Sequence, residues 1–267
     1  MEYEIVGLIA SVLMGFTLGL IGGGGAILTV PILVYLFKIN PILATAYSLF
    51  IVGTTALFGG FNYYKKGEVD LKTGLIFAIP SLISVYIVRS FIVPNIPFEI
   101  FKINNFILTK PILIMTVFSV VMLLASFSMI SSKKNLANKE NQNKKNYIRI
   151  PLQGLLIGSI AGFVGAGGGF LIIPTLVILV ELPMKKAIGT SLFIIAIQSL
   201  LGFIGDVQHQ NFINWFLLLK IVSVALIGLF FGIKLSSKFS EKSLKKGFGI
   251  FVLTMGILIF MDQLRKM

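Results

Sequence analysis

Cysteine, histidine and charge are scarce in this chain of 267 residues. It has no cysteine and one histidine, and charged residues make up 12% of it. The absence of cysteine excludes disulfides, thiolate zinc sites and a cysteine nucleophile. One histidine excludes a histidine-rich metal site, and we expect no metal and no cofactor. Soluble globular chains are about 25% charged, so this composition argues against a water-soluble enzyme.

Hydrophobic residues make up 56% of the chain. They form long runs, which we place at 5–37, 42–62, 71–93, 111–130, 151–180, 187–206, 213–234 and 243–262. A helix of about 20 apolar residues spans a bilayer, and six of these runs fit one crossing each. We therefore predict an all-α polytopic protein of the plasma or inner membrane, with the lipid bilayer as its surroundings. The N-terminus lacks basic residues and a cleavage site, so we expect no cleaved signal peptide.

The net charge of +13 has two interpretations. On a soluble protein it would suggest a nucleic-acid partner. On a membrane protein it indicates basic loops on the cytoplasmic side. Because the chain is so apolar, we adopt the second interpretation and expect no nucleic-acid partner.

Two of the apolar runs, 5–37 and 151–180, are too long for one crossing and too short for two. Both are interrupted by glycines: Gly22, Gly23, Gly24 and Gly25 in the first, and Gly165, Gly167, Gly168 and Gly169 in the second. Each glycine costs a helix about 1 kcal/mol, and irregular backbone at membrane depth must be covered by protein or line a cavity. We predict a re-entrant hairpin in each run. Two short, tilted crossings per run are an alternative with the same parity.

The chain divides into a first membrane repeat (1–130), a polar linker (131–149) and a second membrane repeat (150–267). The two halves align without a gap at one constant offset, which matches residues of distinctive type: Gly22 with Gly165, Pro31 with Pro174, and Ser48 with Ser191. Internal duplication of this kind is typical of secondary transporters. Each repeat is predicted to contain a glycine-broken hairpin and three transmembrane helices.

The positions of the lysines and arginines predict how each repeat is oriented across the membrane. If each broken run crosses once, the bases are spread evenly over both sides. If each run turns back, most bases fall on the side of the linker, as the positive-inside rule requires. We therefore predict a cytoplasmic linker, both termini outside, and inverted repeats.

Inverted hairpins that enter from opposite faces would bring their glycine tips together near the midplane. A half-helix begins after each tip, near Ala26 and Phe170, with unpaired N–H groups and about half a positive charge from its dipole. Such half-helix ends bind anions, so we predict a small-anion site at the tips. Pro31 and Pro174 are expected to fix the hairpin bend. Tight helix packing is the alternative for glycines, and we prefer it for the outer pairs Gly15/Gly19 and Gly158/Gly162.

Polar side chains are expected to join this site. Ser48 and Thr55 lie on one helix face, two turns apart. Ser191 and Gln198 repeat that spacing in the second half, and Thr190 lies beside them. We predict all five as substrate-binding. Hydroxyl groups bonded to their own helix carbonyls are the alternative.

Charged residues inside the predicted spans are few. Arg89 and Lys220 are the bases well inside spans, each near one end, and we expect both to snorkel to the interface. An electropositive vestibule is the alternative. Asp206 and His209 lie at a span end and in a loop, where a proton relay is conceivable. No acid lies in the middle of a span, so the sequence shows no evident proton or sodium carrier.

The glycine clusters are followed in each half by a proline and then by Ala44-xxx-Ser48-Leu49 or Ala187-Ile188-Gly189-Thr190-Ser191-Leu192. This duplicated pattern resembles the sulfite exporter TauE/SafE family over nearly the whole chain. The resemblance implies export of sulfite, sulfoacetate or a related sulfur-containing or organic anion. One departure is that Ala46 and Tyr47 stand where the second half has Gly189 and Thr190, which puts a symmetric hydroxyl pair in doubt.

The leading hypothesis is a membrane transporter that exports a small anion by alternating access and is not an enzyme. No triad or paired carboxylates support catalysis, and the glycines lack the Gly-Lys-Ser/Thr ending of a phosphate loop. The alternatives are an anion channel with the same site and a carrier for a different small organic anion. A homo-oligomer is possible.

Overall fold

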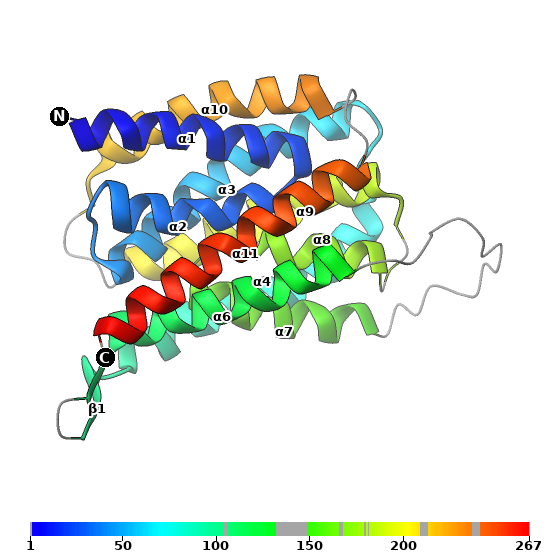
Figure 1. Ribbon diagram of the computed structural model, residues 1–267. Helices are drawn as coiled ribbons and strands as arrows, with labels where there is room; N and C mark the ends of the chain where they lie inside the picture. Colours follow the sequence, from blue (N-terminus) through cyan, green and yellow to red (C-terminus); the bar gives the residue numbers. More distant parts are fainter. Residues whose placement is uncertain are drawn as a thin grey trace.

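The computed structural model describes residues 2–103, 106–131, 149–165, 168–178, 180, 182–208, 213–236 and 241–266. Most of the predicted linker 131–149, together with Gly167 and His209, lies outside these ranges. The described helices lie roughly parallel or antiparallel in one bundle (Figure 1). This arrangement confirms an all-α architecture.

The first half begins with helix α1 (Glu2–Ile21), and the chain then reverses at Gly22. The first return leg (Gly23–Leu36) combines a 3₁₀ segment η1 (Gly23–Leu28), one α-turn α2 (Thr29–Pro31) and a π segment η2 (Ile32–Leu36). Three further helical stretches follow: α3 (Pro41–Lys65), α4 (Leu71–Ile87) continued by η3 (Val88–Ile92) and α5 (Val93–Asn95), and α6 (Lys110–Ser131). The segment between α5 and α6 holds a short antiparallel pair, β1 (Glu99–Ile103) and β2 (Phe106–Thr109).

The second half repeats this order. It consists of α7 (Arg149–Val164), the second return leg α8 (Gly169–Ile178), α9 (Met184–Val207), α10 (Trp215–Ser236) and α11 (Glu241–Lys266). Figure 1 places the two ends of the chain, the start of α1 and the end of α11, at the same end of the bundle.

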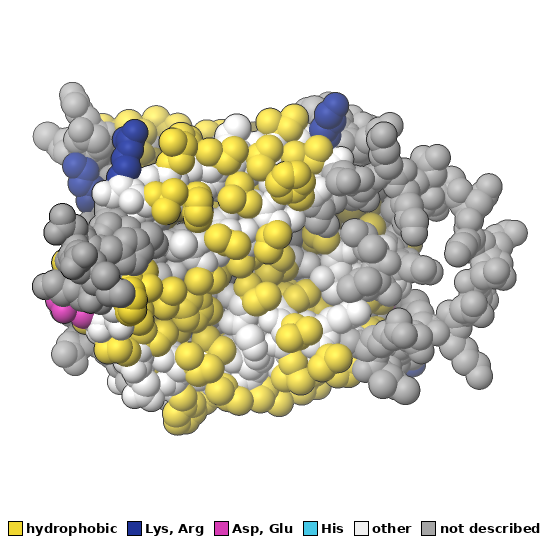
Figure 2. Space-filling model, turned by 60° about the horizontal axis from the view of Figure 1, so that its bottom comes forward, with side chains coloured by type: hydrophobic (Ala, Val, Ile, Leu, Met, Phe, Trp, Pro, Cys, Tyr) yellow, Lys and Arg dark blue, Asp and Glu magenta, His cyan; other side chains and the backbone are white. Residues whose placement is uncertain are grey.

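Among the described residues, six helices are long and apolar enough to cross a membrane: Glu4–Ile21, Pro41–Lys65, Leu71–Asn95, Lys110–Phe127, Met184–Val207 and Trp215–Ser236. Five of them coincide with runs predicted as single crossings. The first is the outgoing leg of the predicted hairpin, so that leg alone reaches the length of a span. Figure 2 shows hydrophobic side chains across the middle of one face and coloured lysine and arginine side chains near its two ends, the pattern of a bilayer-embedded surface.

Each helix packs along a helix of the other half. Helix α1 lies along α10, and the helices at the corresponding repeat positions, α7 and α4, lie along each other. Helix α3 pairs with α9, and α6 pairs with α11, so these helices contact their own counterparts. The pairing is thus the same when the two halves are exchanged. Among the candidate spans, α3 and α9 are the most buried.

Glycine brings α1 and α10 into backbone contact. A Cβ atom added at Gly15 would lie 1.9 Å from the carbonyl oxygen of Ala225, and one at Gly228 would lie 2.0 Å from that of Val12. In the counterpart pair, a Cβ at Gly158 would lie 2.4 Å from the carbonyl oxygen of Ser81. Small residues permit this approach between helices in a membrane. The packing interpretation of these outer glycines is therefore confirmed.

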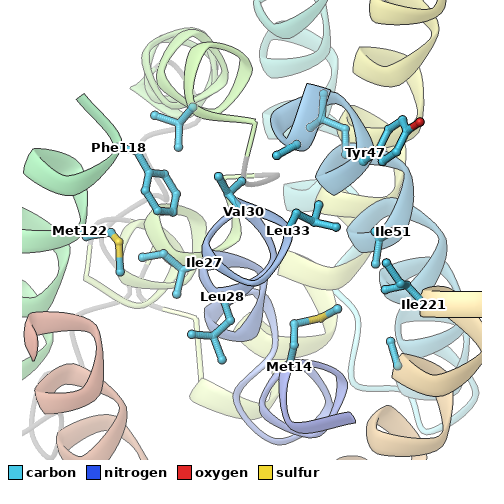
Figure 3. Close-up of a cluster of buried hydrophobic side chains, with 14 of the residues drawn as sticks. Met14, Ile27, Leu28, Val30, Leu33, Tyr47, Ile51, Phe118, Met122 and Ile221 are labelled. Carbon is cyan, nitrogen blue, oxygen red and sulfur yellow. The ribbon is translucent and has the colours of Figure 1, made fainter. Parts of the chain in front are cut away.

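The first part of the first return leg, from Gly23 to Pro31, is buried in the protein. All residues of η1 are buried, and Figure 3 shows Ile27, Val30 and Leu33 among hydrophobic side chains that include Phe118 of α6 and Ile51 of α3. The irregular backbone of η1 is therefore shielded from lipid, which is the condition for non-helical backbone at membrane depth.

Candidate functional site

The two chain reversals are built alike. Gly22 has a φ of 76° and Gly165 a φ of 75°, in the left-handed region that glycine adopts without steric cost. A Cβ at Gly22 would lie 3.1 Å from Ser191 Oγ on α9, whereas one at Gly165 would lie 2.3 Å from Thr45 Cβ on α3. Each reversal therefore packs against the central helix of the other half.

The two glycine clusters touch. A Cβ at Gly23 would lie 2.4 Å from Gly169 Cα, and one at Gly169 would lie 2.5 Å from Gly23 Cα. A Cβ at Gly168 would lie 3.1 Å from the amide nitrogen of Gln198. Residues far apart in the sequence thus form one backbone contact inside the bundle, as the sequence predicted for the hairpin tips.

The other predicted glycines serve the turns themselves. Gly24 and Gly25 are buried in η1, and a Cβ at Gly25 would lie 2.3 Å from the backbone nitrogen of Leu18 on α1. The Gly25 N–H donates to the Gly22 carbonyl at 3.3 Å. Gly25 therefore allows the first return leg to fold closely against α1.

The predicted hydroxyls differ in their environments. The Thr55 hydroxyl donates to the Ile51 carbonyl at 2.6 Å, and the Ser191 hydroxyl donates to the Ile188 carbonyl at 2.8 Å, so both use their own helix. Ser48 Oγ is buried and has no hydrogen-bond partner within the described residues. An unsatisfied buried hydroxyl is uncommon, so Ser48 keeps the strongest claim among the three to a ligand-binding role.

Gln198 on α9 contacts both α4 and the second glycine cluster. Its side-chain oxygen accepts a hydrogen bond of 2.5 Å from the Ser81 hydroxyl on α4. Since its amide nitrogen faces Gly168, Gln198 connects a glycine cluster to α4.

Thr190 and Tyr47 occupy the same repeat position and hold equivalent loops. The Thr190 hydroxyl accepts the Asp70 N–H at 2.9 Å, just before α4. The Tyr47 hydroxyl accepts the Asn214 N–H at 2.7 Å, just before α10. The departure between the two halves at this position is therefore one of side-chain length, and both hydroxyls anchor the start of the next helix.

The two prolines lie beyond the reversals. Pro31 ends α2 immediately before the π segment, and Pro174 lies inside α8. The turns themselves occur at Gly22 and Gly165. In the first half, the chain therefore changes helix type at Pro31, nine residues after the turn at Gly22. The proline ring removes a backbone N–H donor at this position.

Arg89 does not snorkel, contrary to the sequence expectation. It is 1% exposed, and Nη1 donates to Asp206 Oδ2 at 3.1 Å and to Thr45 Oγ1 at 3.1 Å. An internal carboxylate and hydroxyl thus replace the water that a snorkelling arginine seeks. Lys220 behaves as expected, because it is partly exposed and pairs with Glu4 at 2.6 Å.

The Arg89–Asp206 pair was missed because its members lie 117 residues apart in the sequence. Each was noted alone, as a base or an acid near a span end. The available signal was the repeat itself, since an inverted arrangement places the ends of α4 and α9 near each other. A π segment at Arg89 is a further structural sign, because such segments are frequent at functional sites.

A groove beside the first return leg does not suit an anion. A groove of about 800 Å³ lies between α1, the first return leg and α11. Its lining is almost entirely apolar, with Thr17, Tyr35 and Asp262 among the exceptions. In the described part of the chain, no three histidine, aspartate or glutamate side chains cluster as metal ligands would. The contact between the glycine clusters is the better candidate.

Comparison with known proteins gives a consistent result. The family model described as sulfite exporter TauE/SafE matches residues 7–259. A probable membrane transporter protein, YunE of Bacillus subtilis (strain 168), is 30% identical over 267 residues, which cover 89% of this chain and 87% of that protein. A probable membrane transporter protein of Xylella fastidiosa (strain 9a5c) is 27% identical over 252 residues, with 92% and 91% covered. No solved structure is a significant match.

Proposed function

Because this chain belongs to the sulfite exporter TauE/SafE family, we propose that this membrane transporter exports a small anion, sulfite or an organosulfonate, by alternating access. The observation that carries the proposal is the contact between Gly23 and Gly169. It joins two turns from opposite halves inside a bundle of apolar helices. The proposed site comprises the glycines of both clusters, with Ser191 and Gln198 beside Gly22 and Gly168. The other proposed members are Ser48 and Thr55 on α3 and Thr190 on α9.

The chemistry of these groups suits an anion. Helix α8 begins at Gly169, and the first N–H groups of a helix point toward its N-terminal end with the positive end of its dipole. Glycine lets a ligand approach that backbone closely. The Ser48 hydroxyl and the Gln198 amide would add hydrogen bonds without a fixed charge, which favours release as well as binding.

Alternating access requires the two halves to move against each other. The turns at Gly22 and Gly165 each pack on the central helix of the other half, so a shift between the halves changes both turns at once. An inside-negative potential favours anion exit by about 2.3 kcal/mol per charge per 100 mV. We propose export driven by that potential, with the repeats inverted across the membrane.

Counterflow into proteoliposomes tests the carrier proposal. We expect labelled sulfite to accumulate in vesicles preloaded with unlabelled sulfite, and sulfate, sulfoacetate and chloride preloads define the selectivity. Gly23→Ala should slow this uptake by about tenfold or more, which corresponds to about 1.4 kcal/mol, because the new methyl group meets the Gly169 backbone. Gly247→Ala is the matched control, since a Cβ there meets nothing within 4 Å.

Two results would contradict the proposal. Sulfite flux without stimulation by internal sulfite would favour an anion channel with the same site. Folded protein that moves no sulfur oxyanion with any preload would remove the proposed substrate class and leave a carrier for a different small organic anion.

Membrane sidedness gives a second prediction. We expect a reporter fused after Met267 to be active only outside the cytoplasm, and one inserted within 132–148 to be active only inside, because the positive-inside rule assigns the basic linker to the cytoplasm. Protease protection of the two tagged proteins in right-side-out vesicles provides the measurement. A cytoplasmic C-terminus would exclude the proposed orientation.

A further inference from the structure

Arg89 presents one edge of its guanidinium group without protein partners. The group lies in η3, within the candidate span Leu71–Asn95, and is 1% exposed. Asp206 and Thr45 both accept from Nη1, which fixes the guanidinium plane. Nε and Nη2, on the opposite edge, have no hydrogen-bond partner among the described residues. Buried donors without partners are rare in proteins and call for an explanation.

The unpartnered edge faces the second glycine turn. A Cβ added at Gly165 would lie 2.3 Å from Arg89 Nη2 and 2.3 Å from Thr45 Cβ. The backbone of the turn therefore lies against the guanidinium, and any side chain at position 165 would occupy the space beside it. Arg89 is buried beside Gly165, so the free edge of its guanidinium is shielded from solvent in this structure.

The first glycine turn has no equivalent charge. Gly232 occupies the repeat position of Arg89, Tyr63 that of Asp206, and Ile188 that of Thr45. The Tyr63 hydroxyl donates to the Gly19 carbonyl at 3.2 Å. Near the first turn, this position therefore joins α3 to α1. Among the described residues, the charged pair is therefore found at the second turn and has no counterpart at the first, although the two halves repeat the same order of helices.

The geometry of the free edge selects a class of ligand. Nε–H and Nη2–H point in parallel from one side of a planar fork, which matches two oxygens of one carboxylate, sulfonate or sulfite group. A halide offers one centre and cannot match both donors equally well. Asp206 balances the arginine charge before binding, so the anion enters a site with no net charge from this pair and can leave again.

From these observations we propose that Arg89 binds the transported anion, through two oxygens held by Nε and Nη2 beneath the Gly165 turn. This inference rests on the proposed anion transport and adds the residue that carries it. It also assigns one anion per chain, at the second glycine turn, in place of a symmetric site shared equally by both turns.

Binding to the purified full-length protein tests this inference by isothermal titration with sulfite, methanesulfonate and chloride. Wild-type protein should bind the two oxyanions at least ten times more tightly than chloride. Arg89→Lys keeps a positive charge beside Asp206 but presents a single ammonium group, so the preference for oxyanions should fall at least tenfold. Lys220→Gln, which removes an exposed base on α10, should leave that preference unchanged.

A second variant addresses the turn. Gly165→Ala places a methyl group against Nη2 and should abolish oxyanion binding. Gly67→Ala is its matched control, because Gly67 has a similar φ of 70° while nothing lies within 4 Å of its added Cβ. A general cost of left-handed backbone would affect both variants equally.

The outcomes separate this inference from the proposed function. Wild-type counterflow of sulfite together with unchanged oxyanion preference in folded Arg89→Lys would overturn the role of Arg89 and leave the transport proposal intact. Equal wild-type affinity for chloride and the oxyanions would also overturn it. If Arg89→Lys does not fold, Arg89→Gln/Asp206→Asn removes both charges at similar volume, and retained oxyanion binding in that double variant would contradict the inference. Absence of both binding and counterflow in the wild type would instead contradict the proposed function.

Discussion

Asp206→Ala is expected to lower the free energy of unfolding by about 3–5 kcal/mol, the usual cost of leaving one partner of a buried ion pair uncompensated. Arg89 would remain charged at 1% exposure, and among the described residues the Thr45 hydroxyl would be the one acceptor left for Nη1. Trp215 is the single tryptophan and its ring lies 5.6 Å from that of Phe50. The Trp215 ring also lies 5.9 Å from that of Phe203, which precedes Asp206 on α9. Its fluorescence during denaturation in detergent therefore reports unfolding near the pair.

The control for this prediction removes both charges together. Arg89→Met/Asp206→Leu should be much less destabilised than Asp206→Ala, because apolar residues of similar volume often replace a buried ion pair at little cost. Glu4→Gln breaks the exposed pair with Lys220 and should change stability little. If the double variant were as unstable as Asp206→Ala, the electrostatic explanation would be wrong and lost packing would account for the effect.

Gly15→Ala should lower the free energy of unfolding by about 1–3 kcal/mol, the range for overpacking a well-packed interior. The added Cβ would lie 1.9 Å from the Ala225 carbonyl oxygen, and both atoms belong to backbone-anchored groups that cannot rotate away. Helices α1 and α10 must therefore separate. The same Trp215 fluorescence measurement applies, since Trp215 begins α10.

The matched control is Gly247→Ala on α11, where the added Cβ meets nothing within 4 Å. Alanine exceeds glycine in helix propensity by about 1 kcal/mol, so this variant should be unchanged or slightly more stable. Equal behaviour of Gly15→Ala and Gly247→Ala would show that α1 and α10 are not in close backbone contact.

The two halves share the order of their helices, but the Arg89–Asp206 pair lies at one of the two turns. The repeat preserves what both halves need, namely the reversals at Gly22 and Gly165 and the loop anchors at Tyr47 and Thr190. Arg89 and Asp206 depart from the repeat and meet at one turn. Symmetric features therefore build the bundle, and the asymmetric pair distinguishes one turn from the other.

The sequence by itself determined the membrane architecture and the location of the chain reversals. Hydropathy is a sum over neighbouring residues, so runs such as 42–62 and 187–206 predicted α3 and α9 without any tertiary information. Gly22 and Gly165 were identifiable for the same reason, since the preference for left-handed backbone belongs to the residue. The constant offset between the halves then predicted that the two glycine clusters would meet.

Tertiary structure alone decided which polar groups face one another. Thr190 and Ser191 are adjacent in sequence, yet one hydroxyl anchors a loop and the other bonds its own helix, because successive helical positions point about 100° apart. Arg89 looked like a snorkelling residue near a span end, and the packing of α4 against α9 supplied Asp206 instead. Burial and partnership depend on contacts between residues 117 positions apart, and local sequence carries no record of such contacts.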